Sequence, residues 1–493
     1  MPAPGSTMGA LADLADGRLT GDPNTAVSDV THDSRQVQPG FLYVAVKGAR
    51  YDGHAFVDQA IENRAAGLCV SSMVHLPDAV AQVPLINVAD TRRAMPIIAA
   101  EVQGNPSLQV DVIGVTGTNG KTTVAYMIES IASAAARTCG LIGTIVTRLG
   151  AREIVNPRTT PEAPDFQRLL RTMVDSQADL IVCEVSSHAL ALGRVDATRF
   201  RIGAFTNLSQ DHLDFHAGME SYFEAKALLL ERAEQRVVWV DDHYGAVLAG
   251  RYPDALLVGW DSFVGASAIR STARGSNFRL RIGQEEADVR LELPGRFNVA
   301  NAMVAAGVAH VAGFAVADIA IGLDRLPAVP GRFEVVSDTN AVTVVVDYAH
   351  TPDGVGTVIE TSRTLTRGRV IAVLGAGGDR DRGKRPQMGL AASSADLVVV
   401  TSDNPRSEDP ATIVDQVAAG VDNPATIKVI DRRDAIRAAL AAAVPGDIVL
   451  ILGKGHETGQ EVGGIVYPFD DRQVAREELA FVGHEPGHGG EIA

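Results

Sequence analysis

The chain has 493 residues, a length typical of about three domains. Its 44 Lys and Arg residues against 60 Asp and Glu residues give a net charge of −16, which argues against binding to nucleic acids or anionic membranes. No apolar stretch is long enough to span a membrane, and we recognise no signal peptide at the N-terminus. We therefore expect a cytoplasmic, multidomain protein whose cysteines, Cys69, Cys139 and Cys183, are reduced and buried.

The apolar pattern of the sequence predicts α/β structure in three domains. Residues 1–107 form a small α/β domain that ends in the turn-rich segment 103–107. Residues 108–332 begin with a strand, a glycine-rich turn and a helix, which is typical of a doubly wound, P-loop ATPase-like sheet. Residues 333–493 alternate strands and helices again, so we expect a Rossmann-like domain with a frayed tail over 483–493.

Short apolar runs mark the expected strands, and amphipathic stretches mark the expected helices. Strands are expected at 41–46, 67–70, 110–116, 180–183, 203–206, 342–346, 370–374, 397–401, 427–430 and 448–452. Helices are expected at 55–66, 122–136, 298–312, 316–323 and 434–443. This order predicts parallel sheets, so ligands should bind at the carboxyl ends of the strands.

A glycine-rich segment follows the expected strand at 110–116 and opens the expected helix at 122–136. In such a turn, backbone N–H groups bind phosphate oxygens, a lysine reaches the terminal phosphates and a hydroxyl binds Mg²⁺. Val115 replaces the first glycine of the common pattern, and an ordinary tight turn is the alternative. We expect a nucleoside triphosphate to bind at Gly117, Thr118, Asn119, Gly120, Lys121, Thr122 and Thr123.

Two polar residues follow neighbouring expected strands. Glu184 comes directly after the strand at 180–183, and His212 lies just beyond the strand at 203–206. Each residue alone could be a solvated loop side chain. Because both stand at strand ends of the sheet that carries the glycine-rich turn, we expect them to take part in a metal-and-phosphate site.

Seven motifs occur in order after DSR (33–35): GTNGKTT (117–123), EVSSHAL (184–190), NLSQDHLDFH (207–216), DYAHTPD (347–353), GAGGDRDRGKRP (375–386), DNPR (403–406) and GKGHE (453–457). In these motifs the sequence resembles the Mur ligases, the ATP-dependent amide-forming enzymes of peptidoglycan precursor synthesis. It looks most similar to the members that add the third amino acid. The resemblance spans nearly the whole chain.

The resemblance implies a UDP-binding N-terminal domain, a central ATPase and a C-terminal domain that brings the amino acid. ATP would phosphorylate the D-glutamyl γ-carboxylate of UDP-N-acetylmuramoyl-L-alanyl-D-glutamate, and the amine of meso-2,6-diaminopimelate would then displace phosphate. These small molecules and two Mg²⁺ ions would be the partners of a monomeric enzyme, with no nucleic acid and no membrane insertion.

The resemblance also assigns roles around ATP. Lys226 lies in the pattern Y-x-x-A-K, whose lysine is carbamylated in the family, whereas the sequence by itself predicts an exposed helical lysine. Asn301 would contact adenine, although a helix-surface amide is the alternative, Asp347 would contact the ribose, and Arg332 the γ-phosphate. The implied catalytic residues are Lys121, Glu184, His212 and carbamylated Lys226, and the implied Mg²⁺ ligands are Thr122, Glu184, His212 and Lys226.

The other two substrates are assigned in the same way. The residues implied to bind the UDP-muramoyl-dipeptide are His32, Ser34, Ala49, Arg50, Tyr51, Thr159, Thr160, Ser186, Leu192 and Arg194. Some relatives carry other residues at His32 and Leu192, and a surface arginine is the alternative for Arg194. The residues implied to bind diaminopimelate are Arg380, Asp403, Asn404, Pro405, Arg406, Gly453 and Glu457.

Diaminopimelate differs from L-lysine by a carboxylate on its distal carbon, so a selective site needs an additional cation. Arg406 supplies one, and lysine-adding relatives carry a different residue there. A helix-flanking surface role is the alternative, because Asp409-Pro410 is typical of a helix start. The sequence favours diaminopimelate, and the rival functions are an L-lysine-adding ligase, a ligase that extends folate with glutamate, and an ATP-driven switch without ligase activity.

Overall fold

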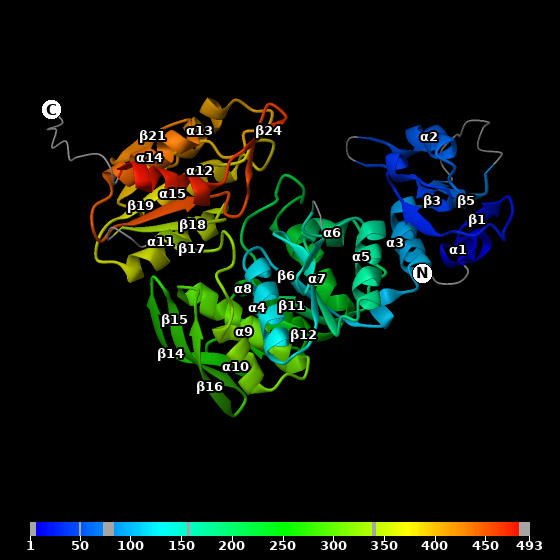
Figure 1. Cartoon of the computed structure of the whole chain (residues 1–493), viewed down its shortest axis with the longest axis horizontal. Coiled ribbons are helices and arrows are strands. Elements are labelled where there is room, and N and C mark those ends of the chain that lie inside the picture. Colours follow the sequence, from blue (N-terminus) through cyan, green and yellow to red (C-terminus); the bar gives the residue numbers. More distant parts are fainter. Residues whose placement is uncertain (1–5, 49–50, 72–82, 155–157, 338–341, 483–493) are drawn as a thin grey trace. The chain divides into compact units, whose positions relative to one another are not determined.

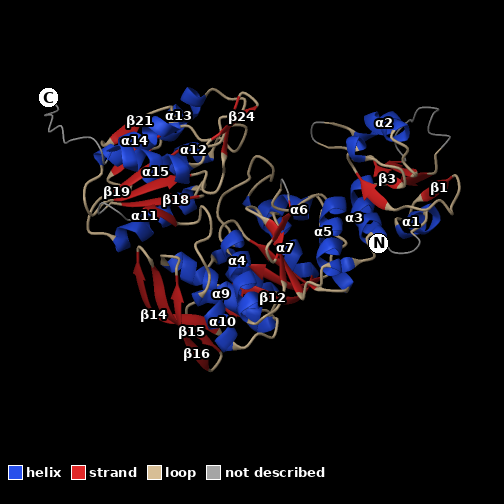
Figure 2. Ribbon diagram, viewed as in Figure 1, coloured by secondary structure: helices blue, strands red, loops and turns tan. Residues whose placement is uncertain are grey.

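The structure is a computed structural model, and it describes residues 6–48, 51–71, 83–154, 158–337 and 342–482 (Figure 1). The chain forms two compact units. The first contains Met1–Thr116, Ala136–Ala204 and Ala225–Arg236, and the second contains Gly117–Ala135, Phe205–Glu224 and Val237–Ala493. Both units contain helices and strands (Figure 2), and none of the described helices has the length and apolar character needed to cross a membrane.

The first unit begins with a five-stranded sheet in the order β1-β5-β4-β3-β2, parallel except for β1. Helices α1 and α3 pack against one apolar cluster, while α2 packs against another formed by alternate strand residues such as Tyr43 and Leu68. The elements are α1 Met8–Leu14, β1 Arg18–Thr20, β2 Asp29–Thr31, β3 Phe41–Val44, α2 Val57–Glu62, β4 Gly67–Ser71, β5 Leu85–Val88 and α3 Thr91–Val102.

The rest of the first unit is built on strands in the order β11-β6-β10-β7-β8-β9. Strand β10 pairs in parallel with both β6 and β7, and all of its residues are buried, as the continuous apolar run predicts. The elements are β6 Asp111–Thr116, β7 Cys139–Ile142, β8 Thr147–Leu149, β9 Arg152–Ile154, α5 Ala163–Asp175, β10 Leu180–Glu184, α6 Ser187–Ala191 and β11 Phe200–Phe205.

The second unit contains α4, which follows the glycine-rich turn, and an antiparallel extension formed by β14, β15 and β16. Burial alternates along β15, so one face of this extension is apolar and the other faces solvent. Its elements here are α4 Lys121–Ala134, α8 His243–Arg251, β13 Leu256–Val258, β14 Val264–Thr272, β15 Gly275–Ile282, β16 Glu285–Leu291, α9 Arg296–Val311 and α10 Val316–Asp324. Helix α7 Met219–Arg232 and strand β12 Ala233–Trp239 are divided between the two units, since Ala225–Arg236 belongs to the first.

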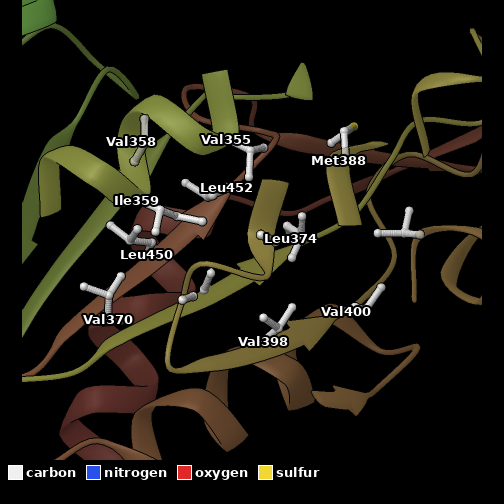
Figure 3. Close-up of a cluster of buried hydrophobic side chains, with 14 of the residues drawn as sticks. Val355, Val358, Ile359, Val370, Leu374, Met388, Val398, Val400, Leu450 and Leu452 are labelled. Carbon is white, nitrogen blue, oxygen red and sulfur yellow. The ribbon is translucent and has the colours of Figure 1, made fainter. Parts of the chain in front are cut away.

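The C-terminal part of the second unit is a six-stranded sheet in the order β17-β18-β22-β19-β20-β21. Alternate residues of its strands enter two clusters, one shared with α11, α12 and α13 and the other with α14 and α15, so helices cover both faces. Figure 3 shows Val355 and Ile359 of α11 beside Leu450 and Leu452 of β22. The elements are β17 Glu334–Ser337, β18 Thr343–Asp347, α11 Pro352–Leu365, β19 Val370–Leu374, α12 Lys384–Ala392, β20 Leu397–Val400, α13 Pro410–Ala418, β21 Thr426–Lys428, α14 Arg432–Ala442, β22 Ile448–Leu452, β23 Gly459–Val462, β24 Ile465–Pro468 and α15 Asp471–Val482.

Most expected elements are present, with ends that differ by a few residues. The helix expected at 55–66 is shorter, because a 3-10 turn occupies Gly53–Phe56 and the α-helix ends at Glu62. The strands β14–β16 and the hairpin of β23 and β24 were not predicted. The helix start expected at Asp409-Pro410 is confirmed, since the Asp409 carboxylate accepts a hydrogen bond from the Thr412 amide. Cys69, Cys139 and Cys183 are free and buried, as expected.

Candidate active site

The glycine-rich turn has the backbone of a phosphate-binding loop. Gly117 has φ +150° and Gly120 has φ +86°, and α4 begins at Lys121 directly after them. A Cβ atom at Gly117 would collide with the Thr206 hydroxyl, so only glycine fits there. The Lys121 ammonium donates hydrogen bonds to the carbonyl oxygens of Gly117 and Thr118, both over 2.9 Å. The loop therefore keeps its lysine folded across its own backbone.

A second loop, the segment after β11, holds the phosphate-binding loop in place. The Asn119 amide donates to Asn207 Oδ1 over 2.9 Å, and Asn207 Nδ2 donates back to the Asn119 carbonyl over 3.1 Å. Thr118 is fixed as well, because its amide donates to the Asn207 carbonyl and its hydroxyl to the Ser209 carbonyl. Neither Asn207 nor Ser209 was predicted as a site residue, although both lie in the NLSQDHLDFH motif.

Two of the residues assigned to ATP lie against this loop in the same unit. Asn301 on α9 is only 8% exposed, so a helix-surface amide is excluded, and its side-chain oxygen lies against Gly120. Arg332 donates from Nη2 to the Thr122 hydroxyl over 3.2 Å, while its buried Nη1 has no hydrogen-bond partner among the residues that the structure describes. A guanidinium held there has a donor available for a phosphate oxygen.

Aromatic rings position the Arg332 guanidinium. Its Cζ lies 4.3 Å from the centroid of the Tyr348 ring, which also packs against His456 with centroids 5.3 Å apart. Burial and the nearby Arg332 charge lower the pKa of His456 to about 3, so this imidazole is neutral at physiological pH. Asp347, at the end of β18, accepts hydrogen bonds from the Phe333 and Ala349 amides, and burial raises its pKa.

Glu184 lies at the end of β10 in the first unit, level with Val115 of β6. Its carboxylate accepts hydrogen bonds from the Thr144 amide over 2.7 Å and from the Thr144 hydroxyl over 3.0 Å. The Thr160 hydroxyl donates to the Glu184 carbonyl, and the Ser186 amide donates to the Thr160 hydroxyl. The carboxylate is therefore fixed within a cluster of hydroxyl groups that also includes Thr159.

His212 lies in a strained segment of the second unit. It has φ +56°, and its Nε2 is 3.5 Å from the Asp211 carboxylate. Asp211 also contacts the Lys384 ammonium at 3.0 Å and the His350 ring at 3.4 Å. Burial opposes ionisation of Asp211, but His350, Lys384 and His212 together hold its pKa well below the usual value. Asp211, His350 and Lys384 were not predicted as site residues.

Lys226 corrects the expectation of an exposed helical lysine. It lies on α7 and is only 2% exposed, and Ala225, Ala227, Leu229 and Leu230 beside it in the sequence are buried as well. Within the described ranges, no group of three or more His, Cys, Asp and Glu side chains is arranged to hold a metal ion. Such a site would therefore need hydroxyl, substrate or modified-lysine oxygens.

The described residues that are assigned to the UDP-muramoyl-dipeptide all belong to the first unit. The Ser34 hydroxyl is buried and donates to Gln59 over 2.6 Å, while Tyr51 is 73% exposed. The buried Nδ1 of His32 has no hydrogen-bond partner within the described ranges, and burial lowers the pKa of this imidazole. Leu192 ends α6. Ala49 and Arg50 lie outside the described residues.

Arg194 belongs to a charged cluster that the sequence did not reveal. The carboxylate of Glu162 contacts Arg158 at 2.7 Å, Arg194 at 2.9 Å and Arg92 at 3.3 Å. Arg194 is not a surface residue, since its side chain is 14% exposed and its Nε is buried, with no hydrogen-bond partner in the described part of the chain. His32, Arg158 and Glu162 also line a cavity of about 620 Å³ in this unit. The cluster has more cationic than anionic groups and suits an anionic ligand.

The residues assigned to diaminopimelate converge at the carboxyl ends of β19, β20 and β22. Gly453 has φ +115° and lies against the Asp403 carboxylate, and Asn404 Nδ2 donates to Glu457 Oε2 over 2.8 Å. Asp403, Asn404 and Pro405 are buried. Strand ends of an open α/β sheet are the usual place for a ligand.

Arg406 is not a simple helix-flanking residue. It has φ +53°, and its Nη1 donates to the Gly378 carbonyl over 2.6 Å. Its guanidinium lies over Gly377, as does the stem of Arg380, so the two arginines approach the same backbone. Arg380 is exposed, and its Nη1 donates to the Asp379 carbonyl over 3.3 Å. The Arg406 Nε also lies 3.4 Å from the Glu461 carboxylate.

Comparisons with known proteins agree with this geometry. Family models described as "Mur ligase family, catalytic domain", "Mur ligase middle domain" and "Mur ligase, glutamate ligase domain" match residues 26–103, 115–309 and 331–455. Two curated relatives are each named UDP-N-acetylmuramoyl-L-alanyl-D-glutamate--2,6-diaminopimelate ligase. The protein from Streptomyces coelicolor is 44% identical, covering 95% of this chain and 96% of its own. The one from Caldanaerobacter subterraneus subsp. tengcongensis is 40% identical, covering 95% and 99%.

A solved structure of a UDP-N-acetylmuramoyl-L-alanyl-D-glutamate--2,6-diaminopimelate ligase is similar along its whole length. It superposes with a TM-score of 0.68 at 30% identity, covering 98% of this chain and 100% of that one. The α/β fold, the phosphate-binding loop and the near-complete match in sequence lead to one assignment. The chain belongs to the Mur ligase family.

Proposed function

We propose that the chain is an ATP-dependent amide ligase that joins meso-2,6-diaminopimelate to the D-glutamyl γ-carboxylate of UDP-N-acetylmuramoyl-L-alanyl-D-glutamate. The observation that carries this proposal is the match over 95% of the chain to relatives named for that reaction. The two arginines over Gly377 support the choice of amino acid, because diaminopimelate has one carboxylate more than L-lysine.

In the first chemical step, an oxygen of the γ-carboxylate attacks the γ-phosphorus of ATP, and ADP leaves. The product is an acyl phosphate. The glycine-rich loop would bind the phosphates through its N–H groups, and Lys121 would exchange the carbonyl oxygens of Gly117 and Thr118 for phosphate oxygens. The buried Nη1 of Arg332 would donate a hydrogen bond to the transferred phosphoryl group and so neutralise the charge that develops on it.

In the second step, an uncharged amine of diaminopimelate attacks the acyl carbon. The tetrahedral intermediate then releases inorganic phosphate and leaves an amide. Arg380 and Arg406 would bind carboxylates of the amino acid, while Asp403 and Glu457 would accept hydrogen bonds from its ammonium groups. Holding the amine in line with the acyl phosphate supplies much of the rate enhancement.

The chain offers a hydroxyl and a carboxylate oxygen of the kind that Mg²⁺ prefers. Mg²⁺ prefers oxygen ligands and is commonly held by one or two carboxylates together with substrate phosphates. Thr122 offers a hydroxyl, Glu184 a carboxylate and His212 an imidazole, and carbamylated Lys226 would add an anionic oxygen. When bound, Mg²⁺ would neutralise phosphate charge during transfer. We propose that the enzyme binds two Mg²⁺ ions.

The UDP-muramoyl-dipeptide would bind in the first unit. The cavity of about 620 Å³ beside His32 and Arg158 is of a size suited to a small-molecule ligand. Arg194, Thr159, Thr160 and Ser186 would contact the dipeptide end, with Ser34, Tyr51 and Leu192 contacting other parts of the molecule. Ala49 and Arg50 are assigned by motif alone.

The proposal has further parts. UDP-binding, ATP-binding and amino-acid-binding domains would span residues 1–107, 108–332 and 333–493. Asn301 and Asp347 would contact adenine and ribose, and Pro405 and Gly453 would shape the amino-acid site. The enzyme would act as a monomer in the cytoplasm, where ATP and nucleotide sugars are made.

A phosphate-release assay with a panel of amino acids tests this proposal. Release from ATP in the presence of UDP-N-acetylmuramoyl-L-alanyl-D-glutamate should require diaminopimelate. Release that requires L-lysine instead would favour the lysine-adding alternative, and release that needs no amino acid would favour an ATP-driven switch. Activity on a folate substrate with glutamate would favour the folate alternative.

A further inference from the structure

Lys454 lies at the centre of the proposed amino-acid site but has no assigned role. It follows Gly453 directly after β22, and its side chain is 0% exposed. Its ammonium donates to Asn404 Oδ1 over 3.2 Å, to Glu457 Oε2 over 3.0 Å and to the Gly459 carbonyl over 2.6 Å. An ammonium has three N–H bonds, so every donor of Lys454 is used inside the protein.

These hydrogen bonds determine how the side chains of Asn404 and Glu457, two proposed diaminopimelate-binding residues, are oriented. Asn404 Oδ1 accepts from both Lys454 and the Glu461 amide, so the Asn404 NH₂ group must face the other way, where it donates to Glu457 Oε2 over 2.8 Å. Glu457 Oε2 thus accepts from a lysine and an amide at once. Both hydrogen bonds to this carboxylate use Oε2, and in the described part of the chain none uses Oε1.

A different cation holds the two loops themselves. Arg432 and Asp471 form a fully buried ion pair at 2.7 Å. Arg432 also donates to the Ser402 carbonyl and to the Leu452 carbonyl, which immediately precede the loops that carry Asn404 and Glu457. Arg432 thus holds the backbone at the strand ends. Lys454 instead holds the side chains of Asn404 and Glu457, which lie in the loops beyond them.

We propose that Lys454 is a positioning residue for the amino-acid site. It fixes Asn404 and the Oε2 oxygen of Glu457, so that Oε1 is presented to an ammonium group of the incoming diamino acid. Lys454 itself does not contact the substrate. The inference rests on the proposed function, since it deepens the account of how that site recognises a diamino acid.

The test replaces Lys454 with methionine, which keeps the length of the side chain and removes the charge. We expect the Lys454→Met variant to raise the KM for diaminopimelate by about tenfold or more. This is the effect of losing a hydrogen bond between charged groups, here the one between Glu457 and the substrate ammonium. The KM values for ATP and for the UDP-muramoyl-dipeptide should stay within twofold of the wild type. Lys428→Met, which removes an exposed lysine of the same sheet, is the matched control and should change none of these values.

A double-mutant cycle separates positioning from general destabilisation. If Lys454 acts through Glu457, the Lys454→Met and Glu457→Gln double variant should have a KM for diaminopimelate close to that of Glu457→Gln alone. Fully multiplicative effects, or equal changes in KM for all three substrates, would overturn the inference. If Lys454→Met does not fold, Lys454→Gln is measured in its place and judged by the same outcomes. A wild-type enzyme that does not use diaminopimelate would instead refute the proposed function.

Discussion

The guanidinium of Arg332 donates a hydrogen bond to the hydroxyl of Thr122, a residue 210 positions earlier in the chain. Thr122 opens the helix behind the phosphate-binding loop, and Arg332 stacks on Tyr348 in the region that leads into the C-terminal sheet. The contact brings a permanently charged donor to the place where ATP phosphates would lie. It links the phosphate-binding loop to the segment that precedes the amino-acid site.

Replacement of Arg332 should therefore slow the chemical step. We expect Arg332→Ala to lower kcat about 100-fold or more, because a preorganised donor to the transferring phosphoryl group is lost. Arg332→Lys should recover only part of the rate, since an ammonium cannot both stack on Tyr348 and bind bidentately. Steady-state kinetics measure both, with Arg367→Ala at an exposed arginine as the control. A kcat for Arg332→Ala within threefold of the wild type would contradict this role.

Lys226 is expected to need carbamylation. Its 2% exposure is costly for a charged lysine, whereas a carbamate beside Mg²⁺ would be stabilised as a ligand. We expect enzyme prepared without CO₂ to have low activity that bicarbonate restores, and Lys226→Arg to lose at least about 100-fold in kcat with no restoration. Activity assays with and without bicarbonate check this, together with mass spectrometry of the intact protein. Full activity in the CO₂-free wild type would rule out the modification.

Arg406 should decide which amino acid is used. We expect Arg406→Ala to raise the KM for diaminopimelate about 100-fold, the cost of losing a bidentate charged contact, while the KM for ATP is unchanged. Because L-lysine lacks the distal carboxylate, the variant should discriminate less between the two amino acids. The ratio of kcat/KM for diaminopimelate and L-lysine is the measurement. A variant with unchanged turnover of diaminopimelate would remove the selectivity argument.

The pair of Glu408 and Arg385 makes stability depend on pH. A hydrogen bond from Arg385, whose side chain is fully buried, lowers the pKa of Glu408 to about 2. The folded-state pKa lies below the ordinary value of 4.5, so the pair contributes its full stability above about pH 4.5 and loses it as the pH falls toward 2.

Glu408→Gln should accordingly lower the free energy of unfolding by about 2 kcal/mol at pH 7. The difference from the wild type should shrink between about pH 4.5 and pH 2, where Glu408 becomes protonated in the wild type. Urea denaturation at a series of pH values measures it, with Glu285→Gln at an exposed position as the control. A difference that does not vary with pH would show that the charge of Glu408 is not the cause.

The central strands of the C-terminal sheet were predictable because their sequences are uninterrupted apolar runs. The expected strands at 370–374 and 448–452 coincide with β19 and β22. The antiparallel strands β14–β16 were missed because the expected strands were sought as continuous apolar runs. The alternation of buried residues with polar ones such as Arg279 along β15 is also a strand signal, and it was not used. The exposed position expected for Lys226 was wrong, since tertiary packing buries nearly all of that part of α7.

The motifs assign side chains to the proposed site, but they do not say how those side chains are held. The charged cluster around Glu162 joins residues as far apart as Arg92 and Arg194. The contacts of Lys454 likewise join two loops about 50 residues apart in the chain. Neither pattern has a local period or spacing, so a single sequence contains no signal for it. Positioning residues of this kind emerge only when the loops are placed in space.

The identity of the product tests the central claim most directly. The purified protein is incubated with ATP, Mg²⁺, UDP-N-acetylmuramoyl-L-alanyl-D-glutamate and an equal mixture of diaminopimelate and L-lysine, and the product is analysed by mass spectrometry. The account predicts the diaminopimelate-containing tripeptide as the main product, formed together with one ADP and one phosphate for each amide bond. A product that contains lysine, or ATP hydrolysis without any new amide, would contradict it.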